Sequence, residues 1–171
     1  MVIEKREDLG PLAQTNAEAE ALWCLGELQA VLAAGEQTGD GFSLVEHEAL
    51  AGHSPPWHRQ PGDDETFYVL EGEMTFWAGD SVRPYQRVGR GAMVFIPRGL
   101  PHSFRVESET ARWLTVGTPA GHERFYRAVG ETAKQRAIPP PGEPDMAKVD
   151  AGARSHGVEL LGPPPSSQPA H

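Results

Sequence analysis

The sequence is poor in cysteine, because Cys24 is the single one among 171 residues. An intrachain disulfide is therefore excluded, and a reducing compartment is the natural expectation. A nucleophilic role for this thiol would require a nearby base. Its place in the apolar run 21–25 favours a buried, unreactive thiol instead.

The sequence also lacks an excess of basic residues and any long apolar stretch. Lysine and arginine total 15 against 24 aspartates and glutamates, which gives a net charge of −9. An acidic surface argues against nucleic acid and anionic membranes as partners, since both select basic patches. No apolar stretch approaches the length of a bilayer span, and residues 1–8 lack the apolar centre of a secretory signal. We therefore expect a soluble cytoplasmic protein with neither nucleic acid nor a membrane as its partner.

Several functional patterns are missing as well. No internal repeat is evident, and the chain has no phosphate-binding glycine loop and no serine in a nucleophile elbow. Its length suits one domain with appended segments. These absences argue against a nucleotide-binding protein and against a serine hydrolase.

Short apolar segments separated by turn residues favour an all-β barrel or sandwich. Gly72 lies between two such segments, where a tight hairpin requires a positive φ. The predicted strands are 22–25, 28–34, 42–48, 56–60, 65–71, 73–78, 92–96, 102–107 and 111–117.

The pattern changes towards the C-terminus. Phe125, Tyr126 and Val129 recur at helical spacing, and a second helix is expected near 145–156 with Asp145 as its N-cap. Eight of the 16 prolines fall at position 139 or later, so we expect no further strand in this region. The apolar segment 158–161 is expected to dock onto the barrel.

Candidate metal ligands lie in the two stretches 52–72 and 91–102. Residues two apart on a strand share a face, so His58 shares one with Gln60. By the same rule, Glu65 and His102 each begin an inward-facing row. Imidazole and carboxylate groups are common ligands of transition metals. The sequence therefore predicts that His58, Glu65 and His102 converge on one metal ion.

The two stretches resemble the two motifs of the cupin superfamily. In the first motif, His58, Glu65 and Gly72 match, while Gln60 replaces the second histidine. In the second motif the matching residues are Gly91, Pro97, Gly99 and His102, while Val106 stands where the motif ends in asparagine. The resemblance implies an all-β fold, a single cupin (double-stranded β-helix or jelly-roll) barrel with a C-terminal helical, proline-rich extension. The expected divisions are 1–20, 21–118 and 119–171.

The resemblance also implies a divalent transition metal, one of Fe, Mn, Ni or Zn, held by His58, Gln60, Glu65 and His102. An amide oxygen is a weaker donor than imidazole, so Gln60 should loosen zinc or nickel more than iron or manganese. Three alternatives remain: Gln60 ligates weakly, it hydrogen-bonds a bound water, or the site holds no metal.

Within the superfamily, the stretches 56–59, 64–72 and 118–121 are most similar to quercetin 2,3-dioxygenases. This resemblance implies an oxygenase-like enzyme for a small aromatic or polyketide-like molecule. Glu65 would be both a metal ligand and the catalytic proton acceptor. A non-catalytic binding or sensing cupin is one alternative. A metal-dependent isomerase or cyclase is another.

We expect the substrate pocket beside the metal. Phe67, Val69, Phe104 and Val106 are predicted to form its apolar wall, and the helix at 121–129 either covers this pocket or only fills the barrel. His47 and His53 could line the pocket or have a structural role, whereas His122, His156 and His171 are expected to be solvated. The family resemblance and the sparsely charged strands in 21–34 predict a homodimer formed through sheet edges.

Overall fold

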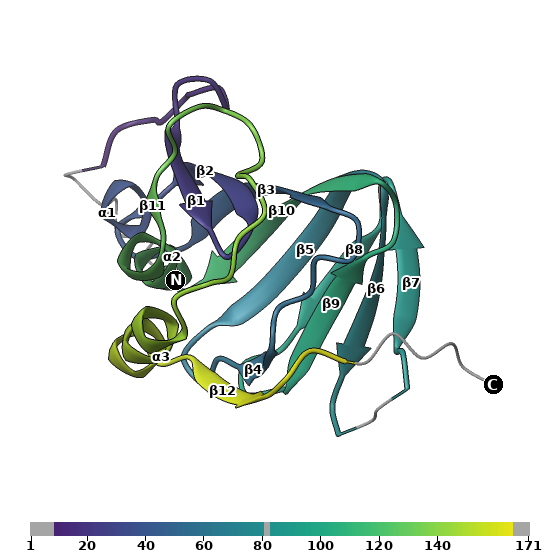
Figure 1. Ribbon diagram of the computed structural model, residues 1–171. Helices are drawn as coiled ribbons and strands as arrows, with labels where there is room; N and C mark the ends of the chain where they lie inside the picture. Colours follow the sequence, from purple (N-terminus) through teal and green to yellow (C-terminus); the bar gives the residue numbers. More distant parts are fainter. Residues whose placement is uncertain (1–8, 81–82, 166–171) are drawn as a thin grey trace.

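The computed structural model describes residues 9–80 and 83–165, and most of its regular structure is β-strand (Figure 1). The strands are β1 (Glu20–Cys24), β2 (Glu27–Ala33), β3 (Ser43–Leu50), β4 (Trp57–Arg59), β5 (Asp64–Glu71), β6 (Glu73–Ala78), β7 (Gln86–Gly89), β8 (Met93–Ile96), β9 (His102–Val106), β10 (Thr110–Thr118), β11 (Glu131–Thr132) and β12 (Glu159–Gly162). The helices are α1 (Gly35–Thr38), α2 (His122–Val129) and α3 (Met146–Ser155).

The strands form two antiparallel sheets. One has seven strands in the order β11-β1-β2-β3-β10-β5-β8, and the other has five in the order β12-β4-β9-β6-β7. The all-β jelly-roll predicted from the sequence is confirmed, although the strands make two separate sheets rather than one closed barrel. This arrangement leaves a space between the sheets that apolar side chains fill.

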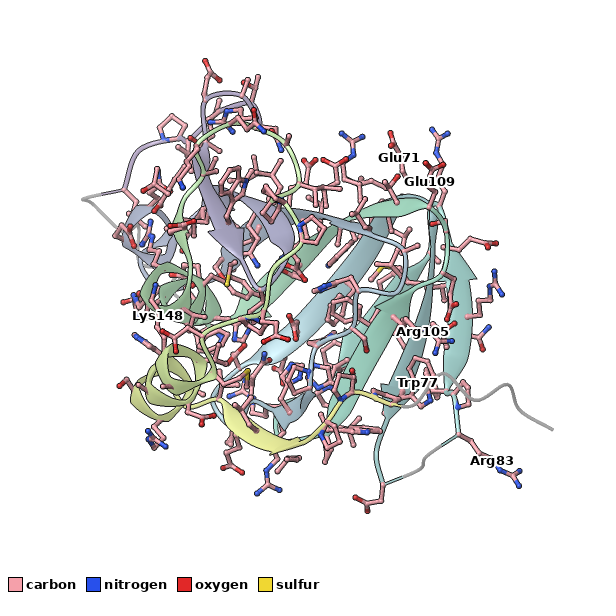
Figure 2. All side chains as sticks on the ribbon, in the orientation of Figure 1. Glu71, Trp77, Arg83, Arg105, Glu109 and Lys148 are labelled. Carbon is pink, nitrogen blue, oxygen red and sulfur yellow. The ribbon has the colours of Figure 1, made fainter. Side chains whose placement is uncertain are left out.

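One apolar cluster lies between the two sheets. Alternation along β5 points Phe67 and Val69 inward, and both are at most 2% exposed. Phe67 contacts an aromatic ring of the other sheet, since the ring centroids of Phe67 and Phe76 are 4.9 Å apart. On the opposite face of that sheet, Arg105 lies over the ring of Trp77 at 5.2 Å, and Figure 2 labels both side chains. Burial of such side chains contributes roughly 1.5–3 kcal/mol each.

A second apolar cluster joins the first strands to the C-terminal helices. Leu22 and Val31 of the seven-stranded sheet pack with Phe125 of α2 and Val149 of α3. Lys148, labelled in Figure 2, donates from α3 to the carbonyl oxygen of Gly130 at 3.0 Å. The C-terminal extension is therefore packed against the sheet, and α2 and α3 lie together beside β1 in Figure 1.

Cys24 belongs to this second cluster. The thiol is buried, and burial raises its pKa well above the usual range of a cysteine. The expectation of an unreactive thiol is in keeping with this environment.

The predicted strands correspond to β1–β6 and β8–β10, and the predicted helices correspond to α2 and α3. Asp145 is the N-cap of α3, where its carboxylate accepts from the backbone N–H of Lys148 at 3.1 Å. The expectation of no strand after residue 139 was wrong. The prolines at 163–165 come only after β12 and do not interrupt it, and β12 pairs with β4. The short strands β7 and β11 were also missed.

No helix among residues 9–80 and 83–165 is long and apolar enough to cross a membrane. The longest, α3, has ten residues.

Gly72 makes the turn between β5 and β6 and provides a test of the packing there. Its φ is +82°, and an added Cβ would overlap the backbone of Thr110 and Ala111. Gly91 has the same φ of +82° with nothing within 4 Å of an added Cβ. Gly91→Ala should therefore cost only the left-handed backbone penalty of about 1–2 kcal/mol. Gly72→Ala should cost about 1–3 kcal/mol more, because it adds overpacking. Denaturant unfolding of both variants measures this difference, and equal losses would contradict it.

Candidate metal centre

Strand pairing brings the three predicted ligands together. His58 of β4 lies directly opposite His102 of β9, with ring centroids 4.3 Å apart. Glu65 enters from β5 in the other sheet, and its Oε2 is 3.2 Å from His102 Nε2. One ligand atom from each of the three residues lies within 4.8 Å of the others. The structure thus brings His58, Glu65 and His102 together, as the strand pattern predicts.

Backbone carbonyl groups orient both imidazoles. His58 Nδ1–H donates to the carbonyl oxygen of Pro56 at 2.8 Å, and His102 Nδ1–H donates to that of Leu100 at 3.0 Å. Neutral His58 therefore presents an unprotonated Nε2 towards the cluster, whereas His102 Nε2 donates to Glu65 and would lose that proton on binding a metal, with the Nδ1–H bond to a carbonyl oxygen retained in both rings. Such a hydrogen bond on the far nitrogen is the usual partner of a metal-bound histidine, because it fixes the tautomer and the ring plane.

The electrostatics favour the ligating forms of these groups. Burial raises the pKa of Glu65, but a hydrogen bond from His102 and the nearby imidazoles of His122, His102 and His58 outweigh it and lower this pKa to about 2. Burial, with His102 as a second contribution, lowers the pKa of His58 to about 3 against the opposing charge of Glu65. At neutral pH the site therefore offers a carboxylate and a neutral imidazole, the forms that bind metal.

Gln60, two residues after His58, contacts a histidine that was expected to be solvated. It is 3% exposed, and its Nε2 is 3.0 Å from Nε2 of His122, the first residue of α2. The expectation that His122 is solvated was wrong, because this side chain is buried and lines the central cavity. Burial lowers the pKa of His122 as well.

A signal for His122 was present in the sequence. His122, Phe125 and Tyr126 occupy positions i, i+3 and i+4 of α2 and therefore share one helix face. The helix with Phe125 and Tyr126 was expected either to cover the pocket or to fill the barrel, and this spacing places His122 on the same face. Solvation was also expected of His156 and His171. His156 is exposed as expected, and His171 lies outside the described residues.

A largely apolar cavity opens beside the candidate ligands. His58 and Glu65 contribute to its lining, together with Phe67, Phe104 and Tyr126. The further lining residues are Leu25, Glu27, Gln29, His47, Pro55, Pro56, Trp113, Thr115, His122, Phe125, Val149, Val158 and Leu160. Side chains of α2, α3 and β12 thus close the cavity on one side.

Two of the four predicted pocket residues are not in the cavity wall. Phe67 and Phe104 line it, but Val69 and Val106 pack in the apolar cluster between the sheets, where each is at most 1% exposed. Each valine shares a strand face with the phenylalanine two residues before it. Each valine is therefore one step farther along its strand from Glu65 or His102, where the space between the sheets is filled by the apolar cluster.

His47 and His53 have defined structural partners. His47 lines the cavity and binds Glu27 through Nδ1 at 2.7 Å, and His53 Nε2 binds the other oxygen of Glu27 at 2.6 Å. His53 itself is not in the cavity wall. One of the two histidines is therefore a lining residue.

The donor set at His58, Glu65 and His102 fits a divalent transition metal. Two imidazoles and one carboxylate suit iron, manganese, nickel or zinc and can leave positions for other ligands. His122 lies close enough to Glu65 and His58 to act on both electrostatically, and Gln60 contacts His122.

Comparison with known proteins agrees with this architecture. Residues 46–117 match the family described as cupin domain. Over 141 residues, 82% of its length, the chain is 28% identical to a quercetin 2,3-dioxygenase from Bacillus subtilis (strain 168). The match covers 40% of that protein, so the chain spans less than half the length of this relative.

Solved structures show the same fold. The polyketide cyclase RemF from Streptomyces resistomycificus is similar with a TM-score of 0.56 and 24% identity, over 83% of this chain and 98% of that one. A predicted oxalate decarboxylase from Thermotoga maritima is similar with a TM-score of 0.57 and 18% identity, over 63% and 99%. At these identities the likeness describes the fold of the chain and not its substrate.

A substitution series tests the metal centre through binding alone. His58→Ala should weaken Ni²⁺ or Zn²⁺ binding by more than the roughly 10–100-fold seen when an outer partner of a ligand is lost. Gln60→His should tighten binding, because imidazole is the better donor for these ions. His156→Ala, at an exposed residue outside the cavity, is the control. Isothermal titration of metal-free protein measures all three, and equal affinities across the series would contradict the assigned site.

Proposed function

The chain carries a cupin domain, and from this premise we propose that it is a metal-dependent, oxygenase-like enzyme for a small aromatic or polyketide-like molecule. One observation carries the proposal: His58, Glu65 and His102 gather beside a cavity whose other walls are mostly apolar and include Phe, Trp and Tyr rings. A charged centre beside apolar walls is the usual composition of a small-molecule site. The 28% identity to a quercetin 2,3-dioxygenase supports the oxygenase class.

The cavity walls suit a flat, unsaturated ligand. Phe67 and Phe104 meet edge to face with centroids 5.7 Å apart, and Phe104 meets Trp113 in the same way at 5.3 Å. Such fixed rings offer both faces and edges for stacking against an aromatic substrate. A ligand hydroxyl or enol oxygen would then be directed to the candidate metal centre.

The residues of the chain would bind, orient and protect the substrate. His58, Glu65 and His102 would hold a divalent metal ion, which supplies Lewis-acid chemistry and, with iron or manganese, access to oxygen chemistry. Among the candidate metal ligands, Glu65 would be the one best placed to take a proton from the substrate, since its carboxylate is ionised. Phe125 and Tyr126 of α2 would exclude water from the site.

Two alternatives from other classes use the same residues. A metal-dependent cyclase or isomerase would need the Lewis acid without oxygen, and the polyketide cyclase RemF shares the fold. A non-catalytic binding protein is compatible with a weakened ligand set, because an amide stands at Gln60 where the motif has histidine. The presence or absence of oxygen consumption separates these classes.

An oxygen electrode tests the proposal directly. Protein loaded with Fe²⁺, Mn²⁺ or Ni²⁺ and given quercetin or a linear poly-β-ketone is expected to consume oxygen with at least one pairing. Glu65→Gln should lower the rate by about 10²–10⁴-fold, the usual contribution of a general base, while His156→Ala should leave it unchanged. Anaerobic turnover would support the cyclase class instead. Binding without turnover in any condition would support the binding protein.

We also propose a homodimer, together with the division into segments 1–20, 21–118 and 119–171. Strand β8 is a sheet edge with exposed Met93 and Phe95, and such an edge is a ready site for pairing. The single buried cysteine supports a reducing, cytoplasmic setting.

Light scattering at micromolar concentration tests the oligomeric state. A mass near twice the 18.6 kDa of the chain is expected, and Phe95→Lys should shift it towards the monomer by placing a charge at the edge. A monomeric mass for the unmodified protein would contradict the proposal.

A further inference from the structure

A second polar cluster faces the same cavity, apart from the candidate metal centre. His47 Nδ1 is 2.7 Å from Glu27 Oε2, and His47 Nε2 is 2.8 Å from Thr115 Oγ1. All three residues line the cavity, and none is more than 6% exposed. A carboxylate, an imidazole and a hydroxyl are thus joined in series within an otherwise apolar wall.

The register of the seven-stranded sheet explains how these side chains meet. In the β2–β3 pair Gln29 lies opposite His47, which makes Glu27 the diagonal neighbour of His47. In the β3–β10 pair Val45 lies opposite Thr115, which makes His47 the diagonal neighbour of Thr115. Diagonal neighbours on one face lie within reach of long side chains. The three residues therefore form a diagonal line across three adjacent strands.

The same diagonal continues to the candidate metal centre. In the β10–β5 pair, Phe67 lies opposite Thr115 and Glu65 lies opposite Gly117. Glu65 is thus the next position on the line, with Cβ atoms about 7–8 Å from those of a diagonal neighbour. Gly117 contributes no side chain here. The separation suits one ligand hydroxyl or one water between the Thr115 oxygen and the Glu65 carboxylate.

We propose that Glu27, His47 and Thr115 form a proton relay that exchanges a proton with a ligand hydroxyl held between Thr115 and the candidate metal centre. The relay deepens the proposed function and rests on it for the position of the ligand. His47 is the proton-holding group. Thr115 is the contact with the ligand, and Glu27 is a positioning residue.

The hydrogen bonds define the direction of transfer. The Glu27 carboxylate accepts from His47 Nδ1–H, so neutral His47 has an unprotonated Nε2 that accepts from the Thr115 hydroxyl. A ligand O–H proton passes to the Thr115 oxygen as the Thr115 proton passes to His47 Nε2. The ligand becomes an oxyanion and His47 an imidazolium beside Glu27. The reverse transfer returns the proton, and no electrons are exchanged.

The surroundings of His47 fit this role. Its ring stacks on Trp113 with an interplanar angle of 4° and meets Tyr126 edge-on at 77°, so its orientation is fixed. Glu27 also accepts from His53 Nε2–H at 2.6 Å and from Gln29 Nε2–H at 2.8 Å. Burial opposes the charge of Glu27, but the imidazoles of His47 and His53 outweigh it and lower the pKa of this carboxyl. The base of the relay is therefore an anion held by three donors.

A buried amide oxygen without a hydrogen-bond partner supports ligand binding at this cluster. Gln29 is 1% exposed and lines the cavity, yet its Oε1 has no hydrogen-bond partner among residues 9–80 and 83–165. A buried amide oxygen without a partner costs about 1–3 kcal/mol. A ligand donor group or an ordered water in the cavity would satisfy it.

A chromophoric catechol tests the relay through proton affinity, without turnover. 4-Nitrocatechol changes colour when it ionises near neutral pH, so its absorbance gives the pKa of the bound molecule. We expect this pKa to be lower by about one unit in the unmodified protein than in Thr115→Val, because a hydrogen bond to the oxyanion favours ionisation. Thr115→Ser keeps the hydroxyl and should match the unmodified protein. Thr110→Val, at an exposed threonine of the same strand, is the control.

Glu27→Gln is a second variant, which changes the relay at the end away from the ligand. It should raise the pKa of the bound probe, as Thr115→Val does. The measurement is made on metal-free and Zn²⁺-loaded protein. If only the metal proposal fails, zinc leaves the pKa of the bound probe unchanged, while Thr115→Val still raises that pKa. An unchanged probe pKa in both Thr115→Val and Glu27→Gln would overturn the relay. Failure of the unmodified protein to bind millimolar probe would overturn it too.

Discussion

The site depends on strand register. His58 lies opposite His102 in the β4–β9 pair, and Glu65 faces them because alternate residues of β5 point inward. A slip of one residue would turn any of these side chains to the other face of its sheet. The inward rows of phenylalanine and valine make such a slip costly, since it would expose the apolar core. The packing of the core thereby fixes the positions of polar groups that contribute little to it.

Two buried carboxylates impose a second constraint on the same region. Glu65 and Glu27 are each at most 6% exposed, and an isolated buried charge is costly. Each is stabilised by imidazoles, Glu65 by His102 and Glu27 by His47 and His53. The imidazoles offset the cost of burying these two charges. The cavity therefore combines an apolar surface with two buried carboxylates, each paired with imidazole groups.

Much of this could be predicted from the sequence, because strand alternation and turn residues are local signals. They located nine strands, two helices and the residues His58, Glu65 and His102. The failures involve long-range contacts. Nothing local indicates that β12 pairs with β4, or that His122 reaches Gln60 from a helix 62 positions away. The alternation of residues along a strand gives the face of each side chain but not where along the strand the cavity ends. Val69 and Val106 were therefore wrongly assigned to the cavity wall.

The central claim is that His58, Glu65 and His102 hold a divalent metal ion. Anomalous diffraction from crystals of zinc-loaded protein tests it most directly. The account predicts one strong peak at about 2.0–2.2 Å from both Nε2 atoms and from a Glu65 oxygen. Saturating zinc with no peak among these three side chains, or peaks confined to surface carboxylates, would contradict it.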